Sequence, residues 1–395
     1  MSKLEELIQK LCPNGVEYKE LGEVLFYEQP SKYIVTSTDY KDEYSTPVLT
    51  AGQTFILGYT NETNGIYKAS KENPVIIFDD FTTSFHWVEF DFKVKSSAMK
   101  MLRPKNVFCN FKYMYYAMQT IKYIPVDHTR QWIEKYSKFT IPIPPIEVQE
   151  EIVRILDKFT ELTAELTAEL AARKKQYEFY RDKVLSDQFD KQTWLPLNEV
   201  ILSLNTGLNP RQFFKLNTDD AVNYYVTIRE IQNHKVIFSE KTDRINNQAL
   251  KLCNNRSNLE KGDVLFSGTG TIGETALIEE TPHNWNIKEG VYTIKPNSQF
   301  LISKYLIYLL ENKQIQDSYM KKAAGGTVKS VPMAEMKKLK IPVPPLEEQK
   351  RIVAILDRFD KLCNDISEGL PAEIEARQKQ YEYYRDKLLT FKELA

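Results

Sequence analysis

The sequence predicts an α+β fold in which two mixed α/β modules are separated by two long antiparallel helices, related by an internal, pseudo-two-fold repeat. Three observations predict it. Residues 141–186 recur as residues 341–390. Both copies have the apolar periodicity of a long helix. The segments before and between them contain short runs of Tyr, Phe, Thr, Val and Ile broken by Gly, Asn and Pro, which is typical of strands and turns.

The repeat is clearest at its two ends. Ile141–Phe159 and Ile341–Phe359 are identical at 12 of 19 positions, and Arg173–Ser186 and Arg377–Thr390 at 10 of 14. The offset between the copies is 200 residues at the first end and 204 at the second, so the second copy is four residues longer in between. The chain is therefore expected to divide into a first module with a short N-terminal helix (1–140), a first long helix (141–193), a second module (194–340) and a second long helix (341–395).

Each long helix is expected to begin directly after a proline-rich segment. Pro142, Pro144 and Pro145 in the first copy lack amide donors and fix the backbone, which excludes them from a helix interior. No proline follows before residue 187, so the first helix is expected to run for about 40 residues, or ~60 Å. In the second copy Gly369 and Pro371 predict a kink or a break. Because a helix with one apolar stripe is unstable alone, the two copies are expected to pack as a pair.

Each module is expected to end on a short helix just before the proline-rich segment. These helices are predicted at Lys112–Ile124 in the first module and Ser303–Ala323 in the second. The starts of the modules also correspond weakly, since Glu17–Val24 reads EYKELGEV and Thr193–Val200 reads TWLPLNEV. We therefore infer that each half of the chain repeats the order of module and helix.

The composition is that of a folded protein of two or three domains, since 42% of the 395 residues are hydrophobic and 27% are charged. No apolar run approaches the ~20 residues of a membrane span, and MSKLEELIQK lacks a signal-peptide core, so we expect a cytoplasmic protein. The four cysteines, Cys12, Cys109, Cys253 and Cys363, lie far apart without His at ligand spacing, and they predict neither a metal site nor disulfide bonds.

The charge is uneven along the chain although its net value is −1. Residues 16–140 carry 15 basic and 15 acidic side chains, and residues 194–340 carry 19 and 15. The helical segments are acidic, with 8 basic against 11 acidic side chains in 141–193 and 9 against 11 in 341–395. A mildly basic module beside acidic helices fits a protein that holds DNA together with a more basic partner. Ordinary surface scatter is the alternative.

The motifs argue against catalysis on this chain. Gly268–Gly273 reads GTGTIG and follows an apolar run, but the next residues predict another strand and not the helix that a dinucleotide site requires. A glycine turn between strands is the favoured interpretation. The Pro-Pro pairs lack the acidic or amide residue and the aromatic of an amino-methyltransferase loop, and the four histidines lie apart from any nucleophile motif. We expect no catalytic residue, cofactor or metal on the chain.

What remains is binding through loops that mix aromatic, polar and basic side chains. Arg, Lys, Gln, Asn and Thr are the donors that contact bases and phosphates. The candidate DNA-binding residues are Lys32, Gln53, Lys68, Arg130, Gln131, Arg211, Arg229, Thr269, Thr271, Thr327 and Lys329. For each of them, a solvated surface position is the alternative.

The chain resembles the specificity (S) subunits of Type I restriction-modification systems over nearly its whole length. The resemblance rests on the duplicated IP-x-PP-x-E-x-Q-x-x-I-V-x-I-L-D start and QYE-x-YRDK end of the repeats. It also rests on YVTIREI and GDVLFSGTG in the second module, and on AGGTVKSVPMAEMKKLKIPVPP before the second helix. The first module matches less well, because Asp127 and His128 replace the glycine pair.

In such families two target-recognition domains sit at the ends of two conserved antiparallel helices, and each domain reads one half of a bipartite DNA site. The resemblance implies two methyltransferase subunits that carry S-adenosylmethionine and form an adenine methyltransferase. It also implies restriction (translocase-nuclease) subunits that use ATP and Mg²⁺. This chain would then recognise double-stranded DNA and perform no chemistry. A tandem scaffold for protein or glycan is one alternative, and a self-sufficient methyltransferase is another.

Two copies of a docking segment predict two copies of one partner. The candidate partner-docking residues lie near the ends of the two helices. They are Gln176, Tyr177, Tyr180, Arg181 and Lys183 in the first copy and Gln380, Tyr381, Tyr384, Arg385 and Lys387 in the second. For the aromatic residues of the first copy, packing within the helix pair together with Val184 is the alternative.

The two copies differ in length where the first contains two consecutive Thr-Ala-Glu-Leu units, within Thr160–Leu170. The second copy has one related unit, Pro371–Ile374. Four residues add ~6 Å and a net ~40° of helix rotation, close to the ~35° twist of one base pair. The helices are therefore expected to set the gap between the two half-sites. The alternative is that these units merely favour helix formation.

Overall fold

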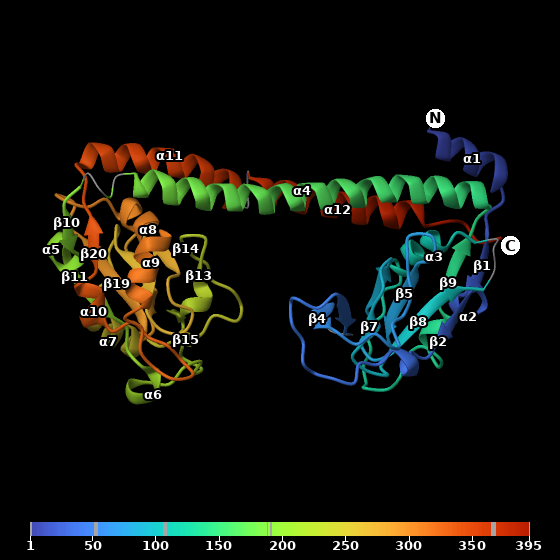
Figure 1. Cartoon of the computed structure of the whole chain (residues 1–395), viewed down its shortest axis with the longest axis horizontal. Helices are drawn as coiled ribbons and strands as arrows, with labels where there is room; N and C mark the ends of the chain where they lie inside the picture. Colours follow the sequence, from blue (N-terminus) through green and yellow to red (C-terminus); the bar gives the residue numbers. More distant parts are fainter. Residues whose placement is uncertain are drawn as a thin grey trace. The chain divides into compact units, whose positions relative to one another are not determined.

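A computed structural model describes residues 2–50, 54–105, 109–187, 189, 192–364 and 369–394. The chain forms two compact units (Figure 1). Unit 1 comprises residues 1–165 and 375–395, and unit 2 comprises residues 166–374. Each unit therefore contains one module together with parts of both long helices. None of the described helices is both long and apolar enough to cross a membrane.

The module of unit 1 contains a four-stranded sheet and a three-stranded sheet, and its first strand pairs with its last. Its elements are α1 (Lys3–Leu11), β1 (Glu17–Glu20), α2 (Leu21–Val24), β2 (Leu25–Glu28), the 3-10 helix η1 (Pro30–Tyr33), β3 (Thr46–Leu49), β4 (Ile56–Thr60), β5 (Val75–Asp79), β6 (Phe85–Val88), β7 (Lys93–Val94), β8 (Met99–Pro104), α3 (Phe111–Met118), the 3-10 helix η2 (Tyr136–Lys138) and β9 (Thr140–Ile143). One sheet has the strand order β2-β8-β5-β6 with antiparallel pairing. The other has the order β4-β3-β7, in which β3 and β7 are parallel.

The module of unit 2 repeats this architecture. Its elements are β10 (Trp194–Pro196), α5 (Leu197–Val200), β11 (Ile201–Thr206), α6 (Pro210–Phe213), β12 (Asn223–Val226), the 3-10 helix η4 (Ile228–Glu230), β13 (Ile231–Gln232), β14 (Lys235–Val236), β15 (Arg244–Ile245), α7 (Asn247–Ser257), β16 (Val264–Ser267), β17 (Thr275–Leu277), β18 (Trp285–Ile287), β19 (Val291–Pro296), α8 (Ser303–Glu311), α9 (Lys313–Met320), α10 (Met333–Lys337) and β20 (Lys340–Pro342). The antiparallel sheet β11-β19-β16-β17 corresponds to β2-β8-β5-β6, and β15-β12-β18 again contains one parallel pair, β12 and β18.

Both modules close in the same way. The first strand pairs with the strand that leads into the long helix, β1 with β9 in unit 1 and β10 with β20 in unit 2, and both pairs are antiparallel. A one-turn helix follows the first strand in each case, α2 or α5. The weak correspondence between the two module starts in the sequence therefore reflects the same local structure.

One helix predicted from the sequence is wrong in extent. Ser303–Ala323 is not a single helix, because α8 ends at Glu311 and α9 begins at Lys313. Asn312 lies between them, and its side chain accepts hydrogen bonds from the amides of Gln314 and Ile315 as an N-cap. The helix in the first module, α3, ends at Met118, six residues earlier than predicted from Lys112–Ile124.

The first long helix is confirmed. α4 (Ile146–Ser186) runs for 41 residues without interruption. In the second copy the described residues form α11 (Leu346–Asn364) and α12 (Leu370–Leu388). Pro371 lies in the first turn of α12, where a missing amide donor costs no helical hydrogen bond, and this fits the break predicted at Gly369 and Pro371.

The start of each long helix is fixed to its module by a buried glutamine. Gln149 is fully buried, donates from Nε2 to the carbonyl of Pro144 at 2.7 Å and accepts at Oε1 from the amide of Asn110 at 2.8 Å. In unit 2, Gln349 is also fully buried and makes the corresponding bonds with Pro344 at 2.8 Å and with the amide of Ile302 at 2.9 Å. Each glutamine side chain satisfies one carbonyl of the proline-rich segment and one backbone amide directly before α3 or α8.

Buried tyrosines make a second set of matched contacts. Tyr116 of α3 donates its hydroxyl to Asp157 of α4 at 2.5 Å, and Tyr308 of α8 donates to Asp357 of α11 at 2.6 Å. In Figure 1, α3 lies between the four-stranded sheet and the helices of unit 1, and α8 has the same place in unit 2. α3 and α8 therefore connect the sheet of each module to the long helix that follows.

The two long helices pack against each other through stacked aromatic rings. In unit 1, Phe159 of the first copy stacks on Tyr384 of the second with ring centroids 5.5 Å apart. In unit 2, Phe359 of the second copy stacks on Tyr180 of the first at 5.9 Å. The duplication relates these two pairs, because Phe159 corresponds to Phe359 and Tyr180 to Tyr384. Each unit is therefore closed by the start of one copy and the end of the other.

We predict that Gln149 stabilises unit 1 and that Gln349 stabilises unit 2, each without effect on the other unit. Gln149→Met should leave the Pro144 carbonyl and the Asn110 amide unpaired inside unit 1, which costs about 2–4 kcal/mol for two buried groups. Hydrogen exchange measured by mass spectrometry should show this loss of protection in peptides of unit 1 and little change in peptides of unit 2. Gln349→Met should give the reverse pattern, so the two variants control for each other. Equal loss of protection in both units from either variant would contradict the prediction.

Candidate nucleic-acid interface and partner surface

In unit 2 two loops join at one edge of the four-stranded sheet. The first loop, residues 268–274, connects β16 to β17, and the second, residues 323–331, follows α9. Gly270 donates its amide to the carbonyl of Lys329 at 2.9 Å, and Val331 donates to the carbonyl of Gly268 at 2.9 Å. The hydroxyls of Thr269 and Ser330 lie 2.9 Å apart. These bonds make a single polar surface, the loop pair of unit 2, from two segments that lie about sixty residues apart in the sequence.

The glycine motif in this loop pair is a turn between antiparallel strands, as the sequence predicted. β16 pairs with β17 directly across the loop, and no helix follows. A side chain at Gly268 would clash with the ring of Tyr292, while Gly270 has a φ of +82° and nothing within 4 Å of its open side. The glycines therefore allow close packing and a tight turn, and they do not prepare a dinucleotide site.

The loop pair brings together four of the predicted DNA-binding residues. Thr271, Thr327 and Lys329 are exposed, and Thr269 is half-buried. Lys329 on this loop, and Lys321 and Lys322 just before it, are exposed, and no ion pair joins them to an acidic side chain among the described residues. Positive charge next to hydroxyl and amide donors is the combination that binds a nucleic-acid backbone.

Two further candidates of unit 2 lie outside the loop pair. Arg211 is exposed on the one-turn helix α6. Arg229 is half-exposed and donates from Nη2 to Asp243 at 2.8 Å. The structure therefore gathers the threonines and Lys329 in one surface and leaves these two arginines on separate segments.

Unit 1 has an equivalent loop pair, residues 80–84 after β5 and residues 125–131 before η2. Gln131 donates its amide to the carbonyl of Asp80 at 2.8 Å, which matches the bond from Val331 to Gly268 in unit 2. The backbone amide of Asp80 donates to the carbonyl of Ala98 at 2.9 Å, and the backbone amide of Gly268 donates to the carbonyl of Gly290 at 2.8 Å. The same backbone scaffold therefore carries different side chains in the two modules.

Within this loop pair, Arg130 and Gln131 have different surroundings. The side chain of Arg130 is 48% exposed. Gln131 is fully buried, donates from Nε2 to Asp127 and Thr129, and accepts from the hydroxyl of Tyr123. Hydrogen bonds from Thr129, Lys135 and Gln131 hold the pKa of Asp127 well below its usual range. Gln131 thus fixes the shape of the second loop, and Arg130 is the side chain that the loop presents to solvent.

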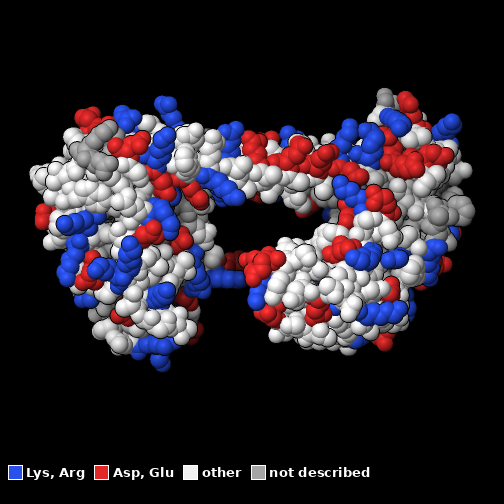
Figure 2. Space-filling view, viewed as in Figure 1, with Lys and Arg blue, Asp and Glu red and all other residues white. Residues whose placement is uncertain are grey.

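The remaining candidates of unit 1 lie away from the loop pair. Lys32 is exposed at η1. Lys68 is 72% exposed and pairs with Asp91 at 2.5 Å. Gln53 lies outside the described residues. Figure 2 shows Lys and Arg side chains spread over the module of unit 2, and side chains of both signs along the helices.

The ends of the long helices show which docking candidates are accessible. Tyr177 and Tyr381 are buried against the modules of units 2 and 1, at 5% and 9% exposure. Arg181 and Arg385 lie over these rings, with 12% and 15% of their side chains exposed. Tyr180 and Tyr384 take part in the aromatic stacks. Gln176, Lys183 and Lys387 are exposed, and Gln380 is half-buried.

The structure also identifies two exposed aromatic residues that the sequence analysis missed. Phe179 is 63% exposed and Tyr383 is 62% exposed, and they occupy the same position in the two copies. In both copies, exposed lysines lie four residues before and four residues after the ring, Lys175 and Lys183 in the first copy. Helical spacing could have found them, because a ring two residues from Tyr177 lies far from the face that Tyr177 buries.

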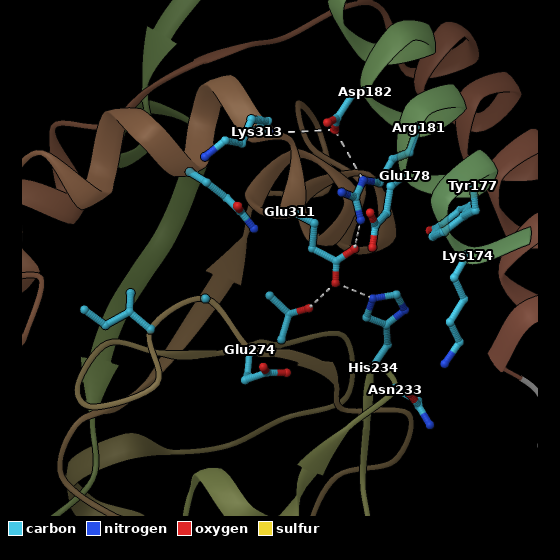
Figure 3. A pocket seen from close by; sticks show the side chains of 14 residues that line it. Lys174, Tyr177, Glu178, Arg181, Asp182, Asn233, His234, Glu274, Glu311 and Lys313 are labelled. Carbon is cyan, nitrogen blue, oxygen red and sulfur yellow. Dashed lines mark hydrogen bonds and ion pairs between the residues drawn. The ribbon is translucent and has the colours of Figure 1, made fainter. Parts of the chain in front are cut away.

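A polar cavity of about 540 Å³ lies between the end of α4 and the module of unit 2 (Figure 3). Glu311 is its central acceptor. It binds Arg181 Nη1 at 3.0 Å and His234 Nε2 at 2.5 Å, and it accepts from Thr275 at 3.3 Å. The other ring nitrogen of His234, Nδ1, lies 3.7 Å from Asp360 of α11. His234 therefore links the β13–β14 turn to both α8 and α11.

The surroundings of His234 decide its charge. Burial by itself lowers the pKa of this imidazole, but the hydrogen bonds and charges of Asp360 and Glu311 outweigh burial and raise the pKa to about 10. His234 is therefore a cation near neutral pH. Among the described residues, no cluster of His, Cys, Asp and Glu side chains could hold a metal ion.

Comparison with known proteins gives one consistent family. A family model described as the Type I restriction modification DNA specificity domain matches residues 13–173 and again residues 197–376. The specificity subunit of the Type I restriction enzyme EcoR124I/EcoR124II of Escherichia coli is 43% identical, over 99% of this chain and 97% of that protein. A putative Type I restriction enzyme specificity subunit of Haemophilus influenzae is 32% identical, over 99% of this chain and 100% of that protein.

Solved structures agree on the fold. The S subunit of a Type I restriction-modification system from M. genitalium aligns with a TM-score of 0.52 at 13% identity, covering 95% of this chain and 96% of that one. A chain from a structure on the assembly and conformational transition of a Type I restriction-modification system aligns with a TM-score of 0.53 at 17% identity, covering 96% and 98%. At such identities the likeness concerns the fold alone.

We predict that His234 makes the stability of unit 2 depend on pH. Because its folded pKa of about 10 lies above the ordinary value of 6.5, its contribution is complete below pH 6.5 and is lost as the pH rises towards 10. The stability advantage of the native chain over His234→Gln, measured by thermal unfolding, should therefore shrink across this window. His128→Gln removes an exposed histidine of unit 1 and serves as the control substitution. A constant difference between the native chain and His234→Gln from pH 6.5 to 10 would refute this assignment.

Proposed function

The chain belongs to the family of Type I restriction-modification DNA specificity subunits, and from that premise we propose that each of its two modules reads one half of a bipartite DNA site. The observation that supports this proposal most directly is the loop pair, which occurs once in each module. The backbone hydrogen bonds of the two loop pairs are equivalent. The amide of Gln131 donates to the carbonyl of Asp80 in unit 1, and the amide of Val331 donates to the carbonyl of Gly268 in unit 2. The exposed side chains differ, with Arg130 in one module and Thr271, Thr327 and Lys329 in the other. One scaffold with two sets of donors suits two different half-sites.

The ends of the long helices are the proposed docking surface for two copies of a methyltransferase subunit. Phe179 in the first copy and Tyr383 in the second are exposed rings in matched places, and rings of this kind anchor protein interfaces. Gln176, Lys183, Gln380 and Lys387 surround them. Tyr177, Tyr381 and Arg181 support this surface from below, because they contact the modules. Arg385 lies over the ring of Tyr381.

The chemistry of the complex is assigned to its other subunits. The methyltransferase subunits would bind S-adenosylmethionine and methylate adenine, and restriction subunits would use ATP and Mg²⁺ for translocation and cleavage. We propose no cofactor, metal or catalytic residue on this chain and a cytoplasmic location for the complex. The alternative, a tandem scaffold for protein or glycan, is not favoured by any feature of the loop pairs.

The proposal predicts a bipartite methylation pattern. When the chain is co-expressed with its cognate methyltransferase subunit, genome-wide mapping should find methylated adenines in a motif of two specified half-sites separated by a fixed gap. Arg130→Ala should relax or abolish recognition of one half-site, and Lys329→Ala should weaken recognition of the other. A scaffold without DNA specificity predicts no such motif. A self-sufficient methyltransferase would bind S-adenosylmethionine as the isolated chain, which the proposal excludes.

The length of α4 is predicted to set the gap between the half-sites. Deleting Thr167–Leu170 removes one Thr-Ala-Glu-Leu unit from a continuous helix, which shortens it by ~6 Å with a net rotation of ~40°. The methylated motif should keep both half-sites and lose one base pair from the gap. Thr167→Ala changes the same unit without changing its length, so the gap should stay as it is. A deletion variant that methylates with the original gap would show that these units only sustain the helix.

A further inference from the structure

A buried ion pair lies beneath the loop pair of unit 1. Lys100, in β8, is fully buried, and the side chain of Asp80, just after β5, is 1% exposed. Lys100 Nζ lies 3.2 Å from Asp80 Oδ2. Neither atom has a hydrogen-bond partner among the described residues. Two buried charges that satisfy each other only by proximity cost several kcal/mol of desolvation, so their presence calls for an explanation beyond stability.

Asp80 connects this pair to the surface of the loop pair. Its Oδ1 accepts a hydrogen bond from the amide of Trp132 at 2.8 Å. Its Oδ2 lies 3.8 Å from Nη1 of Arg130, which is too long for a hydrogen bond but close enough for attraction. The side chain of Arg130 remains 48% exposed. The carboxylate therefore faces one buried cation and one cation at the surface.

The charges of the three residues explain why Lys100 is needed. Without Lys100, the only described cation near the buried Asp80 would be Arg130, and the carboxylate would draw that guanidinium inwards to avoid an unpaired buried charge. With Lys100 in place, Asp80 is already neutralised, and the trio keeps a net charge of +1 that resides on Arg130. The ring of Tyr27 lies 5.1 Å from Lys100 Nζ and adds a further favourable contact to the buried ammonium.

In the module of unit 2, uncharged residues occupy the positions of Asp80 and Lys100. Gly268 occupies the place of Asp80, as their matching backbone bonds show. In unit 2, Tyr292 of β19 pairs with Phe266 of β16, and in unit 1, Lys100 of β8 pairs with Phe78 of β5. Tyr292 therefore occupies the position of Lys100. The Tyr292 hydroxyl donates to the carbonyl of Val331 at 2.6 Å. A neutral ring therefore supports the loop of unit 2, so the scaffold alone does not require the buried pair of unit 1.

We propose that Lys100 is a positioning residue for DNA recognition: by neutralising Asp80 inside unit 1, it leaves the charge of Arg130 available to a phosphate or a guanine edge of one half-site. The inference rests on the proposed function and deepens it. It assigns the half-site contact of unit 1 to Arg130 and makes a buried residue with no access to DNA responsible for that contact. Lys100 acts by neutralising Asp80 and thus leaves the guanidinium free.

The test uses the complex of the full chain with its methyltransferase subunit and a duplex containing the methylated site. Lys100→Met should weaken binding by about ten-fold, the scale of one arginine contact, and should lower the dependence of log affinity on log salt by about one. Asp80→Asn combined with Lys100→Met removes both buried charges and should restore the affinity and the salt dependence. Lys71→Met removes an exposed lysine of the same module outside the loop pair and serves as the charge control.

Two comparisons separate positioning from mere structural support. In an Arg130→Met background, Lys100→Met should cause no further loss of affinity, because the contact through which it acts is already gone. Substitutions in the half-site read by unit 2 should cost the same affinity in the native complex and in Lys100→Met. If Lys100→Met binds like the native complex, or if the double variant with Asp80→Asn is as weak as Lys100→Met alone, the inference is overturned. Failure of the native complex to methylate any bipartite site would instead overturn the proposed function on which it rests.

Discussion

The structure depends on the need to bury one apolar stripe along two long helices. A 41-residue helix with a single apolar face cannot persist in water by itself, so its whole length needs a cover. In each unit the cover has two sources, a module and the other copy of the repeat. The core of unit 1 contains Val148 and Ile152 from the start of α4 together with Tyr381 and Leu389 from the end of the second copy. Unit 1 is therefore completed by a second stretch of chain, residues 375–395, whereas unit 2 is one contiguous stretch, residues 166–374.

This constraint limits the choice of side chain in some parts of the sequence and leaves it open in others. The ends of the repeats supply Gln149, Gln349 and the stacked aromatic pairs, whose geometry leaves little choice of side chain. The loop pairs are joined by backbone hydrogen bonds, which every residue type except proline can donate. Arg130 can thus stand where unit 2 has Ser330 without loss of the scaffold. A recognition protein needs this combination, because its specificity changes through side chains while its partner surface stays the same.

The sequence predicted those features that depend on local periodicity and chain stiffness. The 3.6-residue spacing and the prolines predicted α4 and the start of its helix, and the predicted strand after Gly273 identified the glycine motif as a turn. The equivalence of the two loop pairs could not be predicted, because Asp80 and Gly268 share no chemistry and their match is visible only in non-local hydrogen bonds. Gln131 shows a further limit, since an amide that can contact a base can equally hold a loop together from inside.

The two units also differ where the end of one helix copy meets the module. In unit 1 the hydrogen bond that joins this helix end to the module is uncharged, since the hydroxyl of Tyr381 donates to Gln119 at 2.7 Å. In unit 2 Glu311 binds Arg181 and His234 instead, and the hydroxyl of Tyr177 is left without a partner among the described residues. An ionic junction weakens with salt and with loss of the imidazolium proton, whereas a neutral one does not. The two proposed docking surfaces, with Phe179 exposed in one and Tyr383 in the other, therefore stand on supports that respond differently to solution conditions.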